Sequence, residues 1–284
     1  MDRREELREF LKSRRARVRP DDVGLAQHGG RRRVPGLRRE EVARLAGVSV
    51  DYYVRLEQGR GQNPSAEVLD SIARTLRLDA SERTYLFELV RPVPGIEGPA
   101  APQTVRPGVR RLLDSLAHSP AYVLGRRLEV LAWNTMARVL IADFPALPAG
   151  GRNLARLVFL DSSARQRYVN WQRKADDTVA ILRMDFGRHP RDPRLNALVA
   201  ELSAESADFR RMWSDRHVQE KTHGDKSLYH PLVGTLPLSF ETLRLPDDPD
   251  QALVVYVADP GSRAEQELRL LASKAESGKL WAAP

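Results

Sequence analysis

The sequence predicts an α+β protein of more than one domain, in which an all-helical N-terminal domain precedes a domain built on an antiparallel sheet. Three observations lead to this class. Apolar residues recur at helical spacing over the N-terminal third of the chain. A stretch rich in proline and glycine follows at residues 91–108. Strand-like stretches, a run of helices and further strand-like stretches then follow one another, an order typical of α+β domains.

The N-terminal domain, residues 1–91, is expected to hold five helices. In the first, Leu7, Phe10 and Leu11 recur at helical spacing among charged residues. Ser65 and Ser81 are the expected caps of the last two helices. The helices are expected at residues 3–17, at 38–59 (two short helices that break at Gly47), at 65–77 and at 81–90. Residues 20–37 are expected to be a loop, and residues 92–107 an interdomain linker.

The C-terminal domain, residues 108–284, is expected to place its helices on one face of an antiparallel sheet. Asn134 is the expected N-cap of the helix that follows the first hairpin. Helices are expected at residues 108–118, 135–142, 163–184 and 263–275, with shorter ones after Asp192 and Ser206. Strands are expected in a hairpin over residues 121–133 and in the segments HVQEK, KSLYHPLVG, TLPLSFETLRL and ALVVYVA of residues 217–258.

The positive charge is concentrated near the N-terminus. The formal net charge is +8, and residues 1–91 hold 20 Arg and Lys against 15 Asp and Glu. Lys12 is the one lysine among them, and the other basic residues are arginines. Arginine can donate two parallel hydrogen bonds to a phosphate or to a guanine edge, which lysine cannot do. A basic N-terminal domain favours a polyanionic partner, and a solvated basic face without a ligand is the alternative.

The composition excludes several classes of function. The chain has no cysteine, so disulfides, thiolate metal sites and cysteine nucleophiles are ruled out. Its N-terminus carries charges where a signal peptide would be apolar, and no apolar run is long enough to span a membrane, so a cytoplasmic protein is expected. No GxSxG, Walker or GxGxxG motif is present, and no catalytic residues are expected.

A helix-turn-helix is predicted at residues 38–58, RREEVARLAGVSVDYYVRLEQ. Ala43 allows two helices to cross closely, and Gly47 tolerates the positive φ that the turn needs. Ser49 can cap the second helix, and apolar residues hold it against the first. An ordinary helical hairpin with a glycine turn is the alternative. On the functional interpretation the second helix enters the major groove of DNA.

The residues predicted to contact DNA lie around that second helix. Arg55 is suited to reading guanine bidentately, and Asp51 either accepts from cytosine N4 or holds an arginine in place. The basic loop at residues 31–33 is suited to a phosphate backbone or the minor groove, with a solvated basic loop as the alternative. The full predicted set is Arg31, Arg32, Arg33, Arg38, Arg39, Ser49, Val50, Asp51, Tyr52, Val54, Arg55 and Arg60.

The stretch 36–65, GLRREEVARLAGVSVDYYVRLEQGRGQNPS, resembles the helix-turn-helix of the XRE family, which includes the phage Cro and cI repressors. The end of the second helix, Glu57 to Arg60, and the Pro64-Ser65 opening of the next helix match the family's pattern. The resemblance implies that Glu57 is structural and pairs with an arginine of the domain. The long arginine-bearing loop between the first two helices departs from the family's pattern.

A second resemblance covers roughly residues 5–275. The segments GRRRVPGLRREEVARLAGVS, PAYVLGRRLEVLAWN, RNLARLVFLD, DPRLNALVAELS and HPLVGTLPLSFETLRLPDDPDQALVVYVADPGS, in this order, resemble the MmyB-like transcription regulators of actinobacteria. The resemblance implies a C-terminal domain similar to a PAS fold that binds a small ligand. A bound fatty acid or similar small molecule is implied, and no other cofactor is expected.

Ligand contacts in the C-terminal domain are sought among large apolar residues and residues able to hold a head group. The candidates are Tyr122, Trp133, Asn134, Phe159, Trp171, Met184, Phe186, Trp213, His230 and Tyr256. The tryptophans are alternatively ordinary core residues, and Asn134 alternatively only a helix cap. The residue that binds the charged end of an acyl ligand is expected to be Arg156, Arg173 or His230, and the sequence does not decide among them. His217 and His223 hint weakly at a metal, but no metal site is predicted, and Asp176 and Asp177 are expected to be solvated.

Together these patterns predict a DNA-binding regulator that acts as a homodimer on a roughly palindromic operator. Its activity is expected to be modulated by a small, lipophilic, fatty-acid-like ligand that shifts the population of operator-binding states. The sign of regulation stays open between repression and activation. One alternative is a C-terminal domain that serves only dimerisation or protein interaction. Another is an enzyme fused to a DNA-binding domain.

Overall fold

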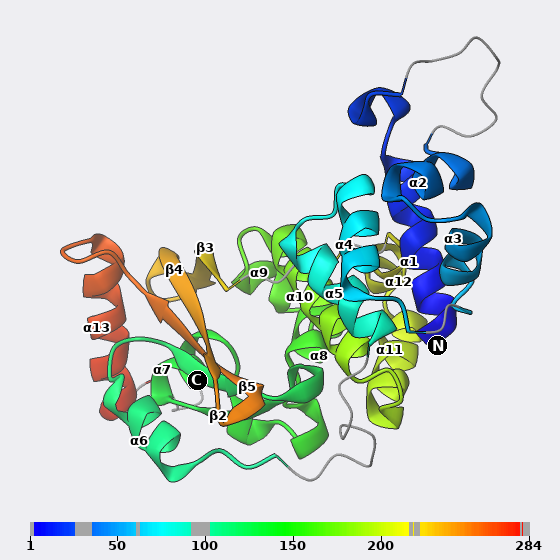
Figure 1. The fold of residues 1–284 in the computed structure, drawn as a ribbon. Coiled ribbons are helices and arrows are strands. Elements are labelled where there is room, and N and C mark those ends of the chain that lie inside the picture. The colour runs from blue at the N-terminus through cyan, green and yellow to red at the C-terminus, as the bar shows by residue number, and fades with distance from the viewer. Residues whose placement is uncertain are drawn as a thin grey trace. The chain divides into compact units, whose positions relative to one another are not determined.

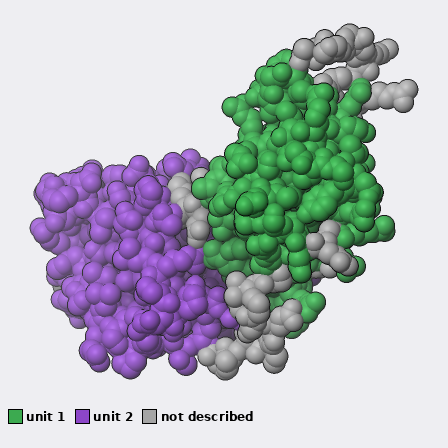
Figure 2. Space-filling view, viewed as in Figure 1, with its two compact units in different colours: residues 1–99, 183–196 green, residues 100–182, 197–284 purple. Residues whose placement is uncertain are grey.

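The computed structural model describes residues 3–25, 36–60, 63–91, 103–215, 218, 222–278 and 280 of the chain. The chain divides into two compact units, which Figure 2 draws in green and purple. Unit 1 comprises residues 1–99 and 183–196, and unit 2 comprises residues 100–182 and 197–284. The long helix α10, Trp171–Arg188, therefore contributes its first part to unit 2 and its last part to unit 1.

Unit 1 is helical throughout its described residues (Figure 1). The end of α10 and the start of α11, Pro193–Glu205, complete it. Its N-terminal elements are α1 (Arg3–Arg17), the 3-10 turn η1 (Pro20–Val23), α2 (Arg39–Ala46), α3 (Val50–Glu57), α4 (Ala66–Thr75) and α5 (Ala80–Val90). These five α-helices confirm the predicted helical domain with a helix-turn-helix.

Short-range hydrogen bonds define the ends of these helices. Gly47 ends α2 with φ of 70°, a left-handed conformation that glycine adopts without steric cost. The hydroxyl of Ser65 accepts a hydrogen bond from the backbone N–H of Val68 and so caps α4, as predicted. The predicted cap of α5 was wrong, because Asp79 rather than Ser81 accepts from the backbone N–H of Glu82. The Glu82 carboxylate in turn accepts a hydrogen bond from the backbone N–H of Asp79, so the two residues form a capping box.

The core of unit 1 combines apolar packing with buried ion pairs. Phe10 of α1 meets the ring of Tyr85 of α5 edge-on, with centroids 5.2 Å apart. Beside them the fully buried Arg183 donates to the fully buried Glu6 carboxylate at 2.6 Å. The hydroxyl of Tyr85 donates to the same carboxylate oxygen at 2.9 Å. The last part of α10 thus belongs to the packing of the helical unit.

Unit 2 is an α+β unit, and its class confirms the prediction. Its strands are β1 (Ala121–Leu124), β2 (Val130–Trp133), β3 (His223–His230), β4 (Gly234–Leu245) and β5 (Asp248–Val257). Its further helices are α6 (Pro107–Ser115), α7 (Thr135–Leu140), α8 (Leu154–Phe159), α9 (Ala164–Arg167), α12 (Ala207–Ser214) and α13 (Arg263–Glu276), with 3-10 turns η2 (Arg126–Leu128), η3 (Phe144–Ala146) and η4 (Ala149–Gly151).

The five strands form one antiparallel sheet in the order β2-β1-β5-β4-β3. The central strand β5 is buried at the consecutive residues Gln251–Val254 and at Tyr256, as expected for a strand with a neighbour on each side. It pairs with β1 on one side, where Val123 lies opposite Leu253, and with β4 on the other, where Phe240 lies opposite Tyr256. Because side chains alternate along each strand, these two pairs point to opposite faces of the sheet.

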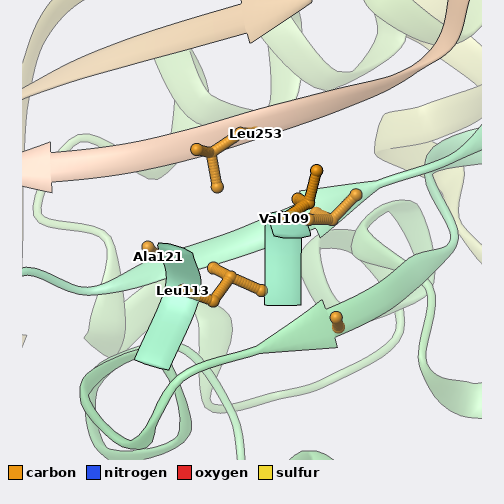
Figure 3. Close-up of a cluster of buried hydrophobic side chains, with 6 residues drawn as sticks. Val109, Leu113, Ala121 and Leu253 are labelled. Carbon is orange, nitrogen blue, oxygen red and sulfur yellow. The ribbon is translucent and has the colours of Figure 1, made fainter. Parts of the chain in front are cut away.

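One face of the sheet is covered by α6. Val109 and Leu113 of this helix pack against Ala121 and Val123 of β1 and against Leu253 of β5, as Figure 3 shows for the residues that it labels. The helix presents these two residues at i and i+4, so both lie on the same side of it.

The opposite face meets the first part of α10. Lys226 of β3 points to this face together with Phe240, Tyr256 and Tyr122 from the neighbouring strands. The carboxylate of Asp177 in α10 forms an ion pair with Lys226. Helices therefore contact both faces of the sheet, and the expectation that they lie on one face was wrong.

Two further expectations about unit 2 change. The helix predicted over residues 163–184 is two helices, α9 and α10, because the chain between them runs beside β3. There Tyr168 forms a bridge with Leu228, and the N–H of Val169 donates to Ser227. The segment HVQEK, predicted to be a strand, lies outside the described residues except for the buried Val218. Among the described residues, no helix is both long and apolar enough to cross a membrane.

Candidate functional site

The turn before α3 places the second helix of the helix-turn-helix. Gly47 reverses the chain after α2, and the backbone N–H of Val48 donates to the carbonyl of Ala43. Ser49 then starts α3, because its hydroxyl accepts from the backbone N–H of Tyr52 at 3.1 Å. Ala43 of α2 is fully buried, and α2 contacts α3.

Helix α3 has one buried and one exposed side. Tyr53 and Leu56 are buried, and the helix packs on α1 and α2. On the other side, Val50 is 41% exposed, and the side chains of Asp51 and Arg55 are 70% and 64% exposed and form an ion pair one turn apart. The exposed side thus presents a methyl-bearing side chain, an acceptor and a guanidinium within its first two turns.

A buried ion cluster fixes the end of α3. The Glu57 carboxylate, 1% exposed, accepts from the Arg15 guanidinium at 3.0 and 3.1 Å and from Arg39 at 3.0 Å. Burial opposes the ionisation of Glu57, yet the hydrogen bonds and charges of the two arginines outweigh it, so its pKa lies below the ordinary value. Arg15 also donates to the carbonyl of Leu37 and joins α1 to the chain before α2. This is the structural role that the XRE resemblance implies for Glu57.

The remaining residues predicted to contact DNA are spread around this helix. Arg31, Arg32 and Arg33 lie outside the described residues. Arg38 is exposed at the start of α2, where its backbone N–H donates to Glu41. Arg39 is half-exposed and bound to Glu57. Tyr52 and Val54 are half-buried on α3, and Arg60 is exposed just after it.

In unit 2, Tyr122 and Tyr256 meet on the sheet face that α10 contacts. Their ring centroids lie 6.3 Å apart, and their hydroxyl oxygens lie 3.4 Å apart. Burial raises the pKa of both phenols, so both remain neutral hydroxyl groups at physiological pH. Both are predicted ligand contacts, and the fold brings them into direct contact.

The predicted tryptophans belong to two other aromatic groups. Trp133 packs on Phe144, with centroids 4.9 Å apart. Trp171 packs edge-on to Phe159 at 5.9 Å, and its indole N–H donates to the carbonyl of Val158. Trp213 belongs to the same group, because it stacks on Phe209, whose ring also meets Phe159 edge-on.

The other ligand candidates are placed differently. Asn134 caps α7 and makes four hydrogen bonds within the unit, which occupy its side-chain amide. Met184 and Phe186 are buried, but they lie in the part of α10 that belongs to unit 1. His230 ends β3 half-buried, accepts from the backbone N–H of Leu232, and has a pKa lowered by burial.

The cationic candidates for a head group have other surroundings. Arg156 donates to both oxygens of Glu201, and these hydrogen bonds raise its pKa. Arg173 is exposed. The prediction missed Lys174, the next residue, which is 6% exposed and lies beside the ring of Tyr168. It also took Asp177 for a solvated residue, whereas its side chain is 12% exposed and pairs with Lys226.

Comparison with known families decides the assignment. A family model described as the MmyB-like transcription regulator ligand binding domain matches residues 105–271, which is more than half of the chain. The chain belongs to the MmyB-like transcription regulators. A helix-turn-helix domain model matches residues 6–86 of this MmyB-like regulator, a range that begins within α1 and ends within α5. No curated protein matches the chain. The regulator thus combines a DNA-binding helix-turn-helix with a ligand-binding domain, in agreement with the predicted family.

Proposed function

We propose that this MmyB-like regulator binds a palindromic DNA operator as a homodimer through α3, and that a small lipophilic ligand in unit 2 modulates this binding. The observation that carries the DNA part is the division of α3 into two sides. Tyr53, Leu56 and Glu57 anchor the helix in unit 1, while Val50, Asp51 and Arg55 are left exposed. A rigidly held helix with an exposed polar side is what major-groove reading requires.

The exposed residues suit base edges. The N-terminal residues of a recognition helix contact bases, and the half-sites of a dimer lie about one helical turn of DNA apart. The Arg55 guanidinium has the geometry for guanine O6 and N7. Its exposed ion pair with Asp51 contributes little energy by itself, so it orients the guanidinium without preventing a contact to DNA.

Arg55→Ala is expected to lower operator affinity about 10-fold or more and to relax the preference at one base pair, because a bidentate contact discriminates by about 1–3 kcal/mol. The operator is first selected from random duplexes with the wild-type protein. Fluorescence anisotropy at one fixed salt concentration then compares it with single-base variants. Arg8→Ala, which removes an exposed arginine of α1, is the control. Equal operator preference in both variants would refute the proposed contact.

The ligand part is supported by the composition of the sheet face opposite α6. Tyr122, Tyr256 and Phe240 give this buried face a mainly apolar, aromatic surface with hydroxyl groups at its centre. Ligand sites are typically apolar with a few polar groups that orient the ligand. A ligand that binds one state of the dimer better than another shifts the operator-binding population accordingly.

Native mass spectrometry of the purified full-length protein is expected to give a dimer with one small molecule retained per chain. Mass spectrometry of an organic extract of the same sample then gives the chemical class of that molecule, which we expect to be lipophilic. A monomer would contradict the proposed dimer. A dimer from which no small molecule can be extracted, and which binds none of the lipids offered to it, would support a purely dimerising role for unit 2.

A further inference from the structure

Lys174 is a buried cation inside unit 2. It lies in the first turn of α10, six residues after Tyr168, and is only 6% exposed. Its ammonium nitrogen is 5.3 Å from the centroid of the Tyr168 ring, which is itself buried. The backbone of Tyr168 is held to β3 by its bridge to Leu228, so this ring belongs to the sheet face that α10 contacts.

The charges around Lys174 do not cancel. Lys226 of β3 and Asp177 of α10 form an ion pair in which the side chains are 8% and 12% exposed. That pair uses the one carboxylate with a resolved electrostatic effect on Lys174. Within the described part of the chain, no residue accepts a hydrogen bond from the Lys174 ammonium group, and none forms an ion pair with it. Among the described residues, the two buried lysines therefore lie near one buried carboxylate, and that carboxylate is paired with Lys226.

Three buried tyrosines lie on the same sheet face, and the charges of Arg167 and Asp161 act on one of them, Tyr168. Tyr168 precedes α10, and Tyr122 and Tyr256 come from β1 and β5. Burial raises the pKa of all three phenols, so they offer hydroxyl groups and no charge. Phe240 closes the side next to Lys226, whose ammonium nitrogen lies 5.5 Å from the ring centroid. A buried ammonium group beside an aromatic ring, on a sheet face that also carries phenol hydroxyl groups, suits an anionic head group on an apolar body.

We infer that Lys174 anchors the single negative charge of the ligand of unit 2, and that binding of this anion brings a proton to the Lys174 amine. The inference rests on the proposed ligand-sensing function and adds to it the anchoring residue and a linkage to pH. It also replaces the three cationic candidates expected from the sequence with a residue that is buried and has no acidic partner among the described residues.

The linkage follows from the state of Lys174 without ligand. The pKa of Lys174 is lowered to about 7, mainly by burial and also by the charge of Lys226. The charge of Asp177 partly opposes both effects. Above that pH the free amine is mostly neutral, and an anion beside it restores the charged form by raising its pKa. Ligand affinity is therefore full below pH 7 and falls as pH rises, by at most about tenfold per pH unit, until the pKa of the bound state is reached.

The test uses dodecanoate and dodecan-1-ol, which share an apolar chain and differ in charge. Isothermal titration calorimetry on the full-length protein measures the affinity of both compounds at pH 6 to 9. Comparing the binding enthalpy in two buffers of different ionisation enthalpy gives the number of protons taken up on binding. We expect tighter binding of dodecanoate than of dodecanol, uptake approaching one proton near pH 8, and a Kd for dodecanoate that rises with pH. Dodecanol is expected to bind without proton uptake.

Lys174→Met replaces the side chain with an unbranched apolar one that is a single heavy atom shorter, and removes its charge. It is expected to bring dodecanoate down to the affinity of dodecanol, to abolish proton uptake and to leave dodecanol binding unchanged. Arg173→Met, which removes the exposed cation one residue earlier, is the matched control and is expected to behave as wild type. Unchanged dodecanol binding shows that the Lys174 variant is folded.

Three outcomes distinguish a failure of the inferred anchor from a failure of the proposed lipophilic ligand. If dodecanol and dodecanoate bind the wild-type protein with equal affinity and without proton uptake, the proposal of a lipophilic ligand is supported. The inferred role of Lys174 as its anchor is then refuted. A Lys174→Met variant with wild-type affinity and pH dependence for dodecanoate refutes it equally. If neither compound binds the wild-type protein at any pH, the proposed lipophilic ligand fails, and the anchor fails with it.

Discussion

Replacing Arg183 with methionine is expected to lower the free energy of unfolding of unit 1 by about 3–5 kcal/mol, the typical effect of removing one partner of a buried ion pair. Arg183 and Glu6 are fully buried, and the guanidinium donates to the carboxylate at 2.6 Å. Without it, the Glu6 carboxylate stays in a low-dielectric interior and loses this countercharge. The hydroxyl of Tyr85 still donates to it, but a neutral donor offsets only part of the loss.

Amide hydrogen exchange of α1 and α5 measures this effect, because it reports the stability of unit 1 inside the intact chain. The double variant Glu6→Gln/Arg183→Met removes both charges and keeps an acceptor for the Tyr85 hydroxyl, so it is expected to lose less than Arg183→Met alone. Arg8→Met disrupts an exposed ion pair with Glu9 and is expected to change stability by at most about 0.5 kcal/mol. Equal protection in the two single variants would show that the buried pair contributes nothing.

Much of the helical unit was predictable, because the hydrogen bonds that define its turns join residues close in sequence. Gly47, Ser49 and Ser65 each act within a few residues, and each has the role that its residue type favours. The cap of α5 was harder, since Asp79 and Ser81 are both good capping residues. The capping box with Glu82 decides between them in favour of Asp79.

The remaining errors come from contacts between residues far apart in the chain. The break between α9 and α10 depends on the pairing of Tyr168 with Leu228, which no local pattern around residue 168 reveals. The burial of Lys174 has the same origin, because its neighbours QRKADD are polar and indicate a solvated helix face. Arg183 finds its acidic partner 177 residues away, so its place in the helical unit could not be foreseen.

The two candidate sites differ in the same way, because one is built from residues close in sequence and the other from residues far apart. The exposed side of α3 follows from helical periodicity once the helix is located, so its members could be predicted residue by residue. The interior of unit 2 is assembled from four strands and a helix, and periodicity shows only that Tyr122 or Trp133 is apolar and buried. Which of them share one face is decided by strand register, which the sequence does not specify by itself.

Glu57→Gln is expected to lower the free energy of unfolding of unit 1 by about 2–3 kcal/mol at neutral pH, because two charge-assisted interactions of a buried carboxylate are lost. The pKa of Glu57 lies below its ordinary value in the folded protein. Its contribution to stability is therefore fully present above the pKa of the unfolded chain, about 4.3, and is lost as pH falls from there through the lower folded value. Hydrogen exchange or circular dichroism over pH 7 to 3 measures this loss.

The variant separates a structural from a DNA-reading role for the end of α3. If Glu57 only fixes the helix through Arg15 and Arg39, its replacement flattens the acid side of the stability curve and weakens binding to every duplex alike. Arg55→Ala is expected to do the reverse, changing base preference while leaving stability intact. Glu5→Gln makes the same charge change at an exposed position of α1 and is the control for net charge. A Glu57→Gln protein with wild-type stability from pH 7 to 3 and an altered base preference would place Glu57 at the DNA surface.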